Sequence, residues 1–153
     1  RYAHAMAQTL ITPVNDSLVD LDVLARIDAD TLEIRDKSVY TQMIMEQRPL
    51  HLDWIVMRNR LSHIDARNKR EIADLLDRLA RMYGFRLVAG FGERVVFREL
   101  FLKGMTLLDM REENGHSFSM SELTARQEVR QLIRAIGPEA LKGHPRHNTD
   151  KSA

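Results

Sequence analysis

An asparagine between two arginines, at the end of an apolar run, is the first arrangement in this sequence that could do chemistry. Residues 54–57 are Trp, Ile, Val and Met, and the run stops at Arg58, Asn59 and Arg60. Open α/β sheets build ligand sites from polar groups at the carboxyl ends of buried strands. The amide of Asn59 offers a donor and an acceptor, which complements the edge of adenine. An asparagine that merely caps the loop after a strand would give the same sequence, so the residues leave both interpretations open.

A basic cluster begins seven residues later, where Arg67, Lys69 and Arg70 open a long amphipathic segment. Arg67 and Arg70 are three residues apart and therefore share a face of a helix. Cations at a helix N-terminus oppose the helix dipole, which favours anions there. A phosphate-bearing partner would offset that local cost. The alternative interpretation is a solvated charged turn, balanced by Asp65 and Glu71.

Other patterns that would carry chemistry are absent from the sequence. No Gly-x-x-x-x-Gly-Lys-[Ser/Thr] loop occurs, so we predict no catalytic residue in this chain and no phosphate cradle of the usual kind. Gly90 and Gly92 form a lone Gly-x-Gly, which is typical of a turn. There is no cysteine, and only His144 and His147 are close among the histidines, so no metal site is predicted.

Bulk composition indicates one soluble globular domain. The chain has 153 residues, of which 44% are hydrophobic and 29% charged. With a net charge of +1, nucleic-acid binding would depend on local patches and not on the overall field. No apolar run approaches the ~20 residues of a membrane span, and no signal peptide is recognisable. The absence of cysteine is consistent with a reducing cytoplasm.

The elements that must position these residues alternate between strands and helices. Strands are predicted at residues 8–14, ending near Pro13, and at 54–57 and 85–89. Helices are predicted at 18–27, 66–83, 98–102 and 119–136, and residues 28–49 are predicted as loop with a short helix near 40–45. This alternation predicts an α/β fold with a mainly parallel sheet flanked by helices. The continuous apolar run at 54–57 further predicts a strand that is buried on both faces.

The clearest helix, at 66–83, has one apolar face and ends at Gly84 as a C-terminal cap. The predicted members of that face are Ile72, Leu75, Leu76, Leu79 and Met82. Ser119 and Glu122 have the spacing of a capping box at the start of the last helix. Residues 142–153 are polar and expected to be disordered, which leaves residues 1–141 as the domain.

Several segments spread along the chain carry a family resemblance: residues 12–20, 53–61, 66–68, 84–86, 94–101, 104–109 and 125–128. Together they resemble the C-terminal half of the MipZ family, the division-site positioning ATPases of the ParA/MinD group. The resemblance runs from about residue 3 to residue 137. It is more specific to MipZ-like proteins than to the ParA group at large.

The resemblance implies the C-terminal portion of a P-loop NTPase fold with a deviant Walker A motif. Such an ATPase dimerises around two ATP molecules, and the P-loop lysines and the contacts to phosphate and Mg²⁺ would lie outside this chain. Asn59 falls where relatives contact the adenine base. The loop from Gly90 to Arg94, which contains Gly92 and Glu93, falls where the backbone borders the nucleotide.

The same resemblance implies partners and a location. The implied partners are a second copy of the protein in an ATP-dependent homodimer, ParB, FtsZ and DNA bound without sequence preference, and no membrane partner is implied. The protein would be cytoplasmic and nucleoid-associated and would inhibit FtsZ assembly. Arg67 matches an arginine of the family's DNA-binding surface, and Lys69 and Arg70 extend it. Glu71 departs from the pattern, because a relative carries arginine there, and the loop before Leu50 is shorter and less basic.

Two other functions fit the same residues. One is a ParA-type chromosome or plasmid partition ATPase, and the other is a non-catalytic interaction module if the P-loop half is naturally absent. An upstream Gly-Gly-x-Gly-Lys-Ser segment would argue against the module. Half of a doubly wound sheet would also expose an apolar edge and face, so we expect this chain to associate with itself or with the P-loop half.

Overall fold

Three parallel strands form the central sheet of the computed structural model, which describes residues 6–15, 17–47, 52–61, 66–110 and 118–137. They are β1 (Thr9–Asn15), β4 (Asp53–Asn59) and β5 (Arg86–Val88), in the order β1-β4-β5. β1 and β4 pair from Thr9 opposite Asp53 to Asn15 opposite Asn59. Both pairings in this sheet are parallel, which confirms the prediction. The carboxyl ends of the strands therefore meet at one edge.

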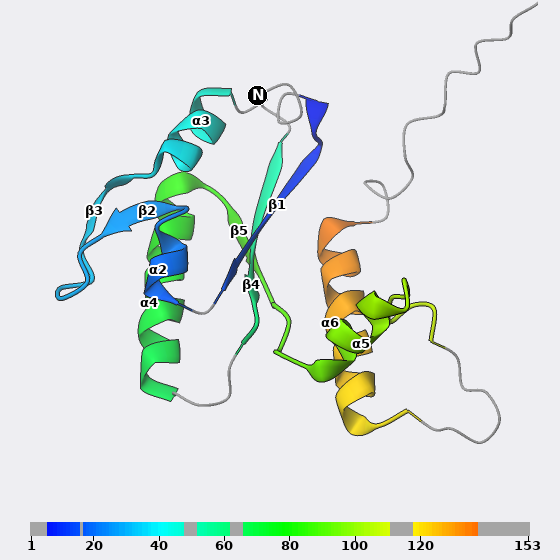
Figure 1. The fold of residues 1–153 in the computed structure, drawn as a ribbon. Helices are drawn as coiled ribbons and strands as arrows, with labels where there is room; N and C mark the ends of the chain where they lie inside the picture. The colour runs from blue at the N-terminus through cyan, green and yellow to red at the C-terminus, as the bar shows by residue number, and fades with distance from the viewer. Residues whose placement is uncertain (1–5, 16, 48–51, 62–65, 111–117, 138–153) are drawn as a thin grey trace, which may run out of the picture.

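Helices lie on both sides of this sheet (Figure 1). One side carries α2 (Leu18–Leu21), α3 (Val39–Gln47) and α4 (Ala66–Tyr83), and the other carries α5 (Val95–Leu102) and α6 (Met120–Ile136). The predicted α/β architecture is confirmed. No helix in the described ranges is long and apolar enough to cross a membrane.

The middle strand β4 is buried on both faces, as its apolar run predicts. Trp54 and Val56 face the main hydrophobic core, whereas Ile55 and Met57 point to the opposite face and are also buried. Fully burying a side chain of this size contributes roughly 1.5–3 kcal/mol. Members of the main core come from the sheet and from the helices on one side of it: Val14, Leu21, Leu24, Ile44, Leu52, Ile72, Leu75, Leu76, Leu79, Tyr83 and Phe85.

Helix α4 has the predicted bounds and nearly the predicted apolar face. Met82 is the exception, because 56% of it is exposed while Tyr83 is buried in its place. Position 83 continues the line of Leu76 and Leu79 more closely than position 82 does, since a turn takes 3.6 residues. Gly84 ends the helix with a φ of 69°, and its N–H donates to the Ala80 carbonyl over 2.9 Å, which confirms the predicted cap.

The prediction for residues 18–37 is wrong in two places, the helix beyond Leu21 and the loop at residues 34–37. α2 stops at Leu21, and a hairpin follows, in which β2 (Ala25–Ile27) pairs antiparallel with β3 (Ile34–Lys37). The apolar residues at 24 and 27 mimic helical spacing, but Asp28 accepts hydrogen bonds from the N–H groups of Asp30 and Thr31 and stabilises a turn instead. The short helix predicted near residues 40–45 is confirmed as α3, which begins one residue earlier and ends two residues later.

Smaller differences occur at β1 and α5. β1 continues through Pro13 to Asn15, because Pro13 is exposed on a strand that pairs on one side only among the described strands. α5 begins at Val95, ahead of the predicted Arg98. α6 begins with the predicted capping box, in which Ser119 Oγ accepts from the Glu122 N–H and Glu122 Oε2 accepts from the Ser119 N–H.

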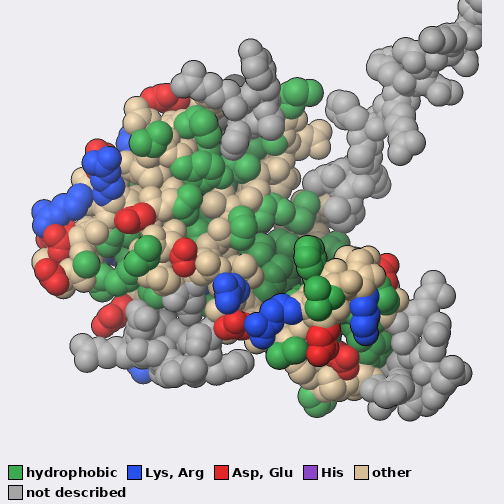
Figure 2. Space-filling model, in the orientation of Figure 1, with side chains coloured by type: hydrophobic (Ala, Val, Ile, Leu, Met, Phe, Trp, Pro, Cys, Tyr) green, Lys and Arg blue, Asp and Glu red, His purple; other side chains and the backbone are tan. Residues whose placement is uncertain are grey.

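A second, smaller core lies between α5 and α6 and the turn that follows α5. Its buried members are Leu100, Leu107 and Ala125. Several large apolar side chains nearby remain exposed, including Phe101 at 82% and Leu102 at 85%. Figure 2 shows hydrophobic side chains reaching the surface over the main body and over the α5–α6 region, interspersed with charged ones.

Candidate nucleotide-binding site

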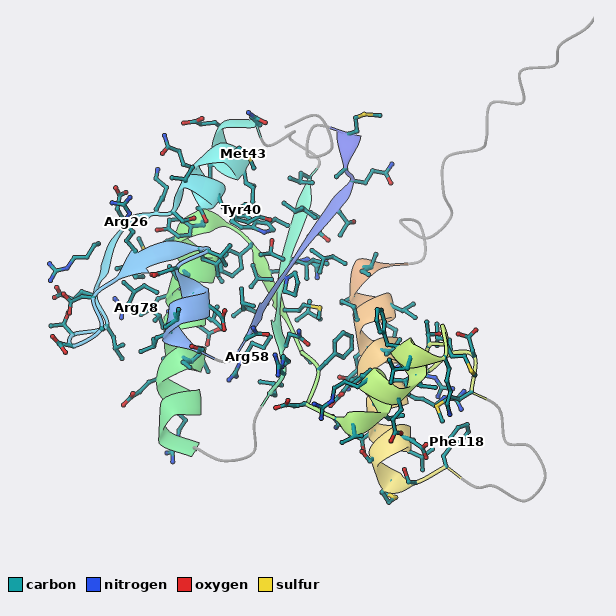
Figure 3. All side chains as sticks on the ribbon, in the orientation of Figure 1. Arg26, Tyr40, Met43, Arg58, Arg78 and Phe118 are labelled. Carbon is teal, nitrogen blue, oxygen red and sulfur yellow. The ribbon has the colours of Figure 1, made fainter. Side chains whose placement is uncertain are left out.

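The loops that leave β4 and β5 run side by side at the carboxyl edge of the sheet. The Phe91 N–H donates to the Arg58 carbonyl over 3.0 Å, and the Leu61 N–H donates to the Phe91 carbonyl over 3.0 Å. The Glu93 N–H donates in turn to the Leu61 carbonyl over 3.3 Å. These bonds continue the parallel pairing of the strands beyond their ends. Arg58, at the end of β4, marks this edge in Figure 3.

A pocket of about 540 Å³ opens between these two loops and α6. Its size is within the range of small-ligand sites, and it combines aromatic surface with a few polar groups, as such sites do. Phe91 and Phe97 contact each other in a tilted arrangement, 5.9 Å between ring centroids, and form an apolar wall. The remaining lining residues are Asn59, Arg60, Gly92, Glu93, Arg94, Arg98 and Val129.

The structure brings Asn59, Gly92 and Glu93 together on the lining of this pocket. Asn59 is the last residue of β4, and Arg60 follows it with a φ of 51°, in the left-handed region. This conformation turns the chain sharply out of the strand. Arg60 Nη2 donates to Glu93 Oε1 over 3.2 Å, which joins the two loops across the mouth of the pocket. The adenine-binding role of these residues stays a prediction.

Gly90 and Gly92 are required by close contacts and not by backbone conformation. Neither has a positive φ. A Cβ at Gly90 would lie 1.6 Å from the Arg58 carbonyl oxygen, and a Cβ at Gly92 would lie 2.1 Å from Arg94 Nη1. Gly90 therefore lets the β5 loop lie directly against the end of β4, whereas Gly92 leaves room for the Arg94 side chain. The interpretation of this Gly-x-Gly as a simple turn misses that function.

A buried ion pair fixes the β5 loop to α6. Arg94 Nη2 donates to Glu128 Oε1 over 2.9 Å, and the Gly92 N–H donates to Glu128 Oε2 over 3.3 Å. The side chains of Arg94 and Glu128 are only 12% and 17% exposed. Arg94 Nη1 is buried without a hydrogen-bond partner among the described residues, packed against Gly92. Sequence reasoning missed this pair, because its members are far apart in the chain and belong to no local pattern.

The predicted basic cluster lies at the start of α4, which begins at the edge of the sheet where β4 ends (Figure 1). The backbone of Arg67 and Lys69 belongs to the first turn of α4, and their side chains lie outside the described part of the structure. Arg70 and Glu71 are both exposed. The first turn contains no acidic residue. The structure thus places these cations at a helix N-terminus, as the sequence predicts.

Comparison with known proteins identifies one family. A family model described as ATPase MipZ matches residues 1–139, which include every strand and helix described above. No match is found among curated proteins.

Proposed function

Because the chain belongs to the MipZ family of ATPases, we propose that the pocket at the carboxyl edge of its sheet binds the adenine of ATP. The observation that supports this most directly is the position of Asn59, which lines the pocket together with Gly92 and Glu93 of the β5 loop. The Asn59 amide would exchange a pair of hydrogen bonds with the base, and Phe91 and Phe97 would contact its ring. In the intact protein, the phosphates and Mg²⁺ would be held by residues outside this chain.

The test is nucleotide binding by full-length protein with Asn59→Ala, measured by calorimetry with ATP and with GTP. Two lost hydrogen bonds should weaken ATP binding by roughly ten-fold to a hundred-fold and should reduce the preference for ATP over GTP. Asn15→Ala is the matched control, because Asn15 lies opposite Asn59 in the sheet register and does not line the pocket. An unchanged preference in Asn59→Ala would contradict the adenine assignment.

The intact protein would then act as a switch, in which ATP holds two copies together and hydrolysis releases them. This proposal is supported by the family and by the pocket, which would contact the base in a chain whose sequence has no phosphate-binding loop. Sedimentation of full-length protein with ATP and with ADP tests it. Dimers are expected with ATP, and monomers are expected with ADP.

The basic start of α4 would bind DNA phosphates without reading the sequence. Arg67, Lys69 and Arg70 would each displace counterions, so affinity should fall steeply as salt rises. Full-length Arg67→Glu/Arg70→Glu should lose DNA binding in the presence of ATP. The control Arg78→Glu/Arg81→Glu reverses two exposed charges further along the same helix and should retain most of the DNA affinity. If the Arg67→Glu/Arg70→Glu variant bound DNA as tightly as wild type, the DNA-binding surface would lie elsewhere on the protein. Repulsion between Glu71 and DNA phosphates would be one reason.

The biological role we propose is positioning of the division site by a cytoplasmic, nucleoid-associated protein that binds ParB and inhibits FtsZ assembly. Support comes from the family alone. Depletion followed by imaging of FtsZ rings separates this role from that of a partition ATPase. Misplaced rings are expected here, whereas lost cargo with normal rings would indicate partition.

A further inference from the structure

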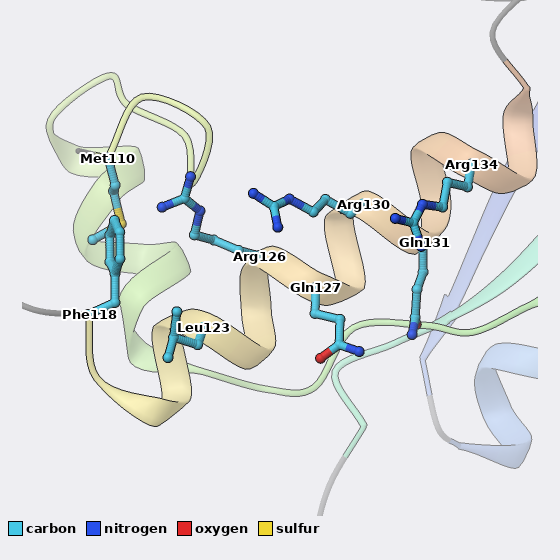
Figure 4. A pocket seen from close by; sticks show the side chains of 8 residues that line it. All are labelled: Met110, Phe118, Leu123, Arg126, Gln127, Arg130, Gln131 and Arg134. Carbon is cyan, nitrogen blue, oxygen red and sulfur yellow. The ribbon is translucent and has the colours of Figure 1, made fainter. Parts of the chain in front are cut away.

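Helix α6 carries a stripe of three arginines that the proposed function does not use. Arg126, Arg130 and Arg134 are four residues apart, so they lie on one side of the helix at intervals of about 6 Å (Figure 4). Arg130 and Arg134 are exposed, and Arg126 is half-buried. Like charges at this spacing destabilise a helix by a few tenths of a kcal/mol per pair. A ligand of opposite charge would offset this repulsion.

The stripe has no counter-charge within α6. The two acidic residues of the helix are engaged elsewhere: Glu122 closes the capping box with Ser119, and Glu128 pairs with Arg94 at the pocket. Within the part of the chain that the structure describes, Arg126, Arg130 and Arg134 form no ion pair. Their charge is therefore available to an acidic ligand.

The arginines line a groove of about 810 Å³ that has two chemically different parts. Met110, Phe118 and Leu123 make the end near the start of α6 apolar, and the arginines follow along the helix (Figure 4). The Arg126 guanidinium lies 4.5 Å from the centre of the Phe118 ring, which holds it at the boundary between the two parts. Gln127 and Gln131 also line the groove and offer amides to a backbone.

We propose that this groove binds an acidic peptide segment of a partner protein. The matching segment has carboxylates spaced like the arginines and one apolar side chain for the end formed by Met110, Phe118 and Leu123. Arginine suits this task because its guanidinium bonds a carboxylate through two N–H groups. The apolar end and the amides favour a peptide over a nucleic-acid backbone, which needs only cations along its length. This surface is separate from the nucleotide pocket, so its test needs no ATP.

The test uses the whole chain and a fluorescein-labelled helical peptide of about 16 residues, with three glutamates four residues apart and a terminal leucine and phenylalanine. Binding is measured by anisotropy at low and at high salt. Arg130→Glu/Arg134→Glu should weaken binding by roughly ten-fold or more. A second peptide with lysines in place of the glutamates should bind this variant better than it binds wild type. Arg81→Glu, a reversal at an exposed position of α4, should leave both affinities unchanged.

The proposal would be overturned if the acidic peptide did not bind wild type, or if it bound the Arg130→Glu/Arg134→Glu variant as tightly as wild type. It would also be overturned if Arg81→Glu lost as much affinity as the double variant, or if a short DNA duplex bound the arginine stripe in place of the peptide. Circular dichroism of each variant shows whether a loss reflects unfolding. Phe118→Ser, which removes the apolar end, should weaken binding of the acidic peptide while leaving Arg130 and Arg134 in place.

Discussion

The hydroxyl of Thr12, on β1, contacts one side chain from β4 and one from α3. Thr12 Oγ1 accepts a hydrogen bond from Trp54 Nε1 over 3.0 Å and lies 2.9 Å from the hydroxyl of Tyr40. Trp54 and Thr12 are buried, and Tyr40 reaches the sheet from α3. The contact fixes the lateral position of β1 on β4 by a polar group, within a mainly apolar core.

Thr12→Val should therefore be costly although it preserves shape. The indole N–H of Trp54 would lose its acceptor in a buried site, which should lower the free energy of unfolding by about 1–3 kcal/mol. Urea denaturation measures the change. Thr12→Ser retains the hydroxyl and should lose less. A loss in Thr12→Val no larger than that in Thr12→Ser would contradict the importance of the hydrogen bond, because Thr12→Val keeps the methyl group and removes only the hydroxyl.

Asp28 makes stability depend on acid pH. The Thr31 N–H and then the Arg35 guanidinium, 2.9 Å from Asp28 Oδ2, stabilise the carboxylate and hold the pKa of Asp28 well below its usual range. A carboxylate whose pKa is lowered by folding stabilises the protein above its unfolded pKa of about 3.9, and this contribution is lost as the pH falls. Wild type should be more stable than Asp28→Asn at neutral pH, and the difference should narrow below pH of about 4. Urea denaturation across that range would contradict this if the difference stayed constant.

Elements with long periodic patterns were predictable from the sequence, whereas those held by distant contacts were not. The pattern of α4 and the capping box of α6 gave both helices nearly to the residue. The β2–β3 hairpin was missed because it is short and depends on the turn at Asp28. The sequence placed Asn59 and the β5 loop as candidates. It gave no sign of the Arg94–Glu128 pair, which exists only once α6 has packed.

The junction of β4 and β5 should tolerate no side chain at Gly90. Gly90→Ala would put a methyl group against the Arg58 carbonyl, so the loops must separate, at an expected cost of about 2–3 kcal/mol. Gly104→Ala is the control, because it meets no atom within 4 Å and carries only the strain of its φ of 64°, about 1 kcal/mol. Thermal melts compare the two. A smaller loss in Gly90→Ala than in Gly104→Ala would contradict the close packing described here.

The whole chain presents surfaces that favour association. β1 pairs only with β4 among the described strands, and Phe101, Leu102 and Val19 are each more than three-quarters exposed. Unpaired strand edges and exposed apolar patches both promote contact with other chains. Such contacts could be made by a second copy or by the remainder of a larger protein.

We therefore expect the apparent mass of this chain to rise with concentration in light scattering. Phe101→Ser/Leu102→Ser should reduce that rise without unfolding the protein, because both side chains are almost fully solvated. A constant monomer mass at high concentration would contradict the expectation. An unchanged rise in the double variant would show that Phe101 and Leu102 are not the side chains through which the chain associates.

Trp54 is the only tryptophan of the chain, and it lies in the middle strand, 5.1 Å from Phe85 and 6.5 Å from Tyr40 between ring centroids. Its fluorescence therefore reports the main sheet and nothing else, without any label. Far-ultraviolet circular dichroism, in contrast, is dominated by α4 and α6. Recording both signals during one melt would reveal whether the α5–α6 region loses its structure at the same temperature as the sheet or melts as a separate unit.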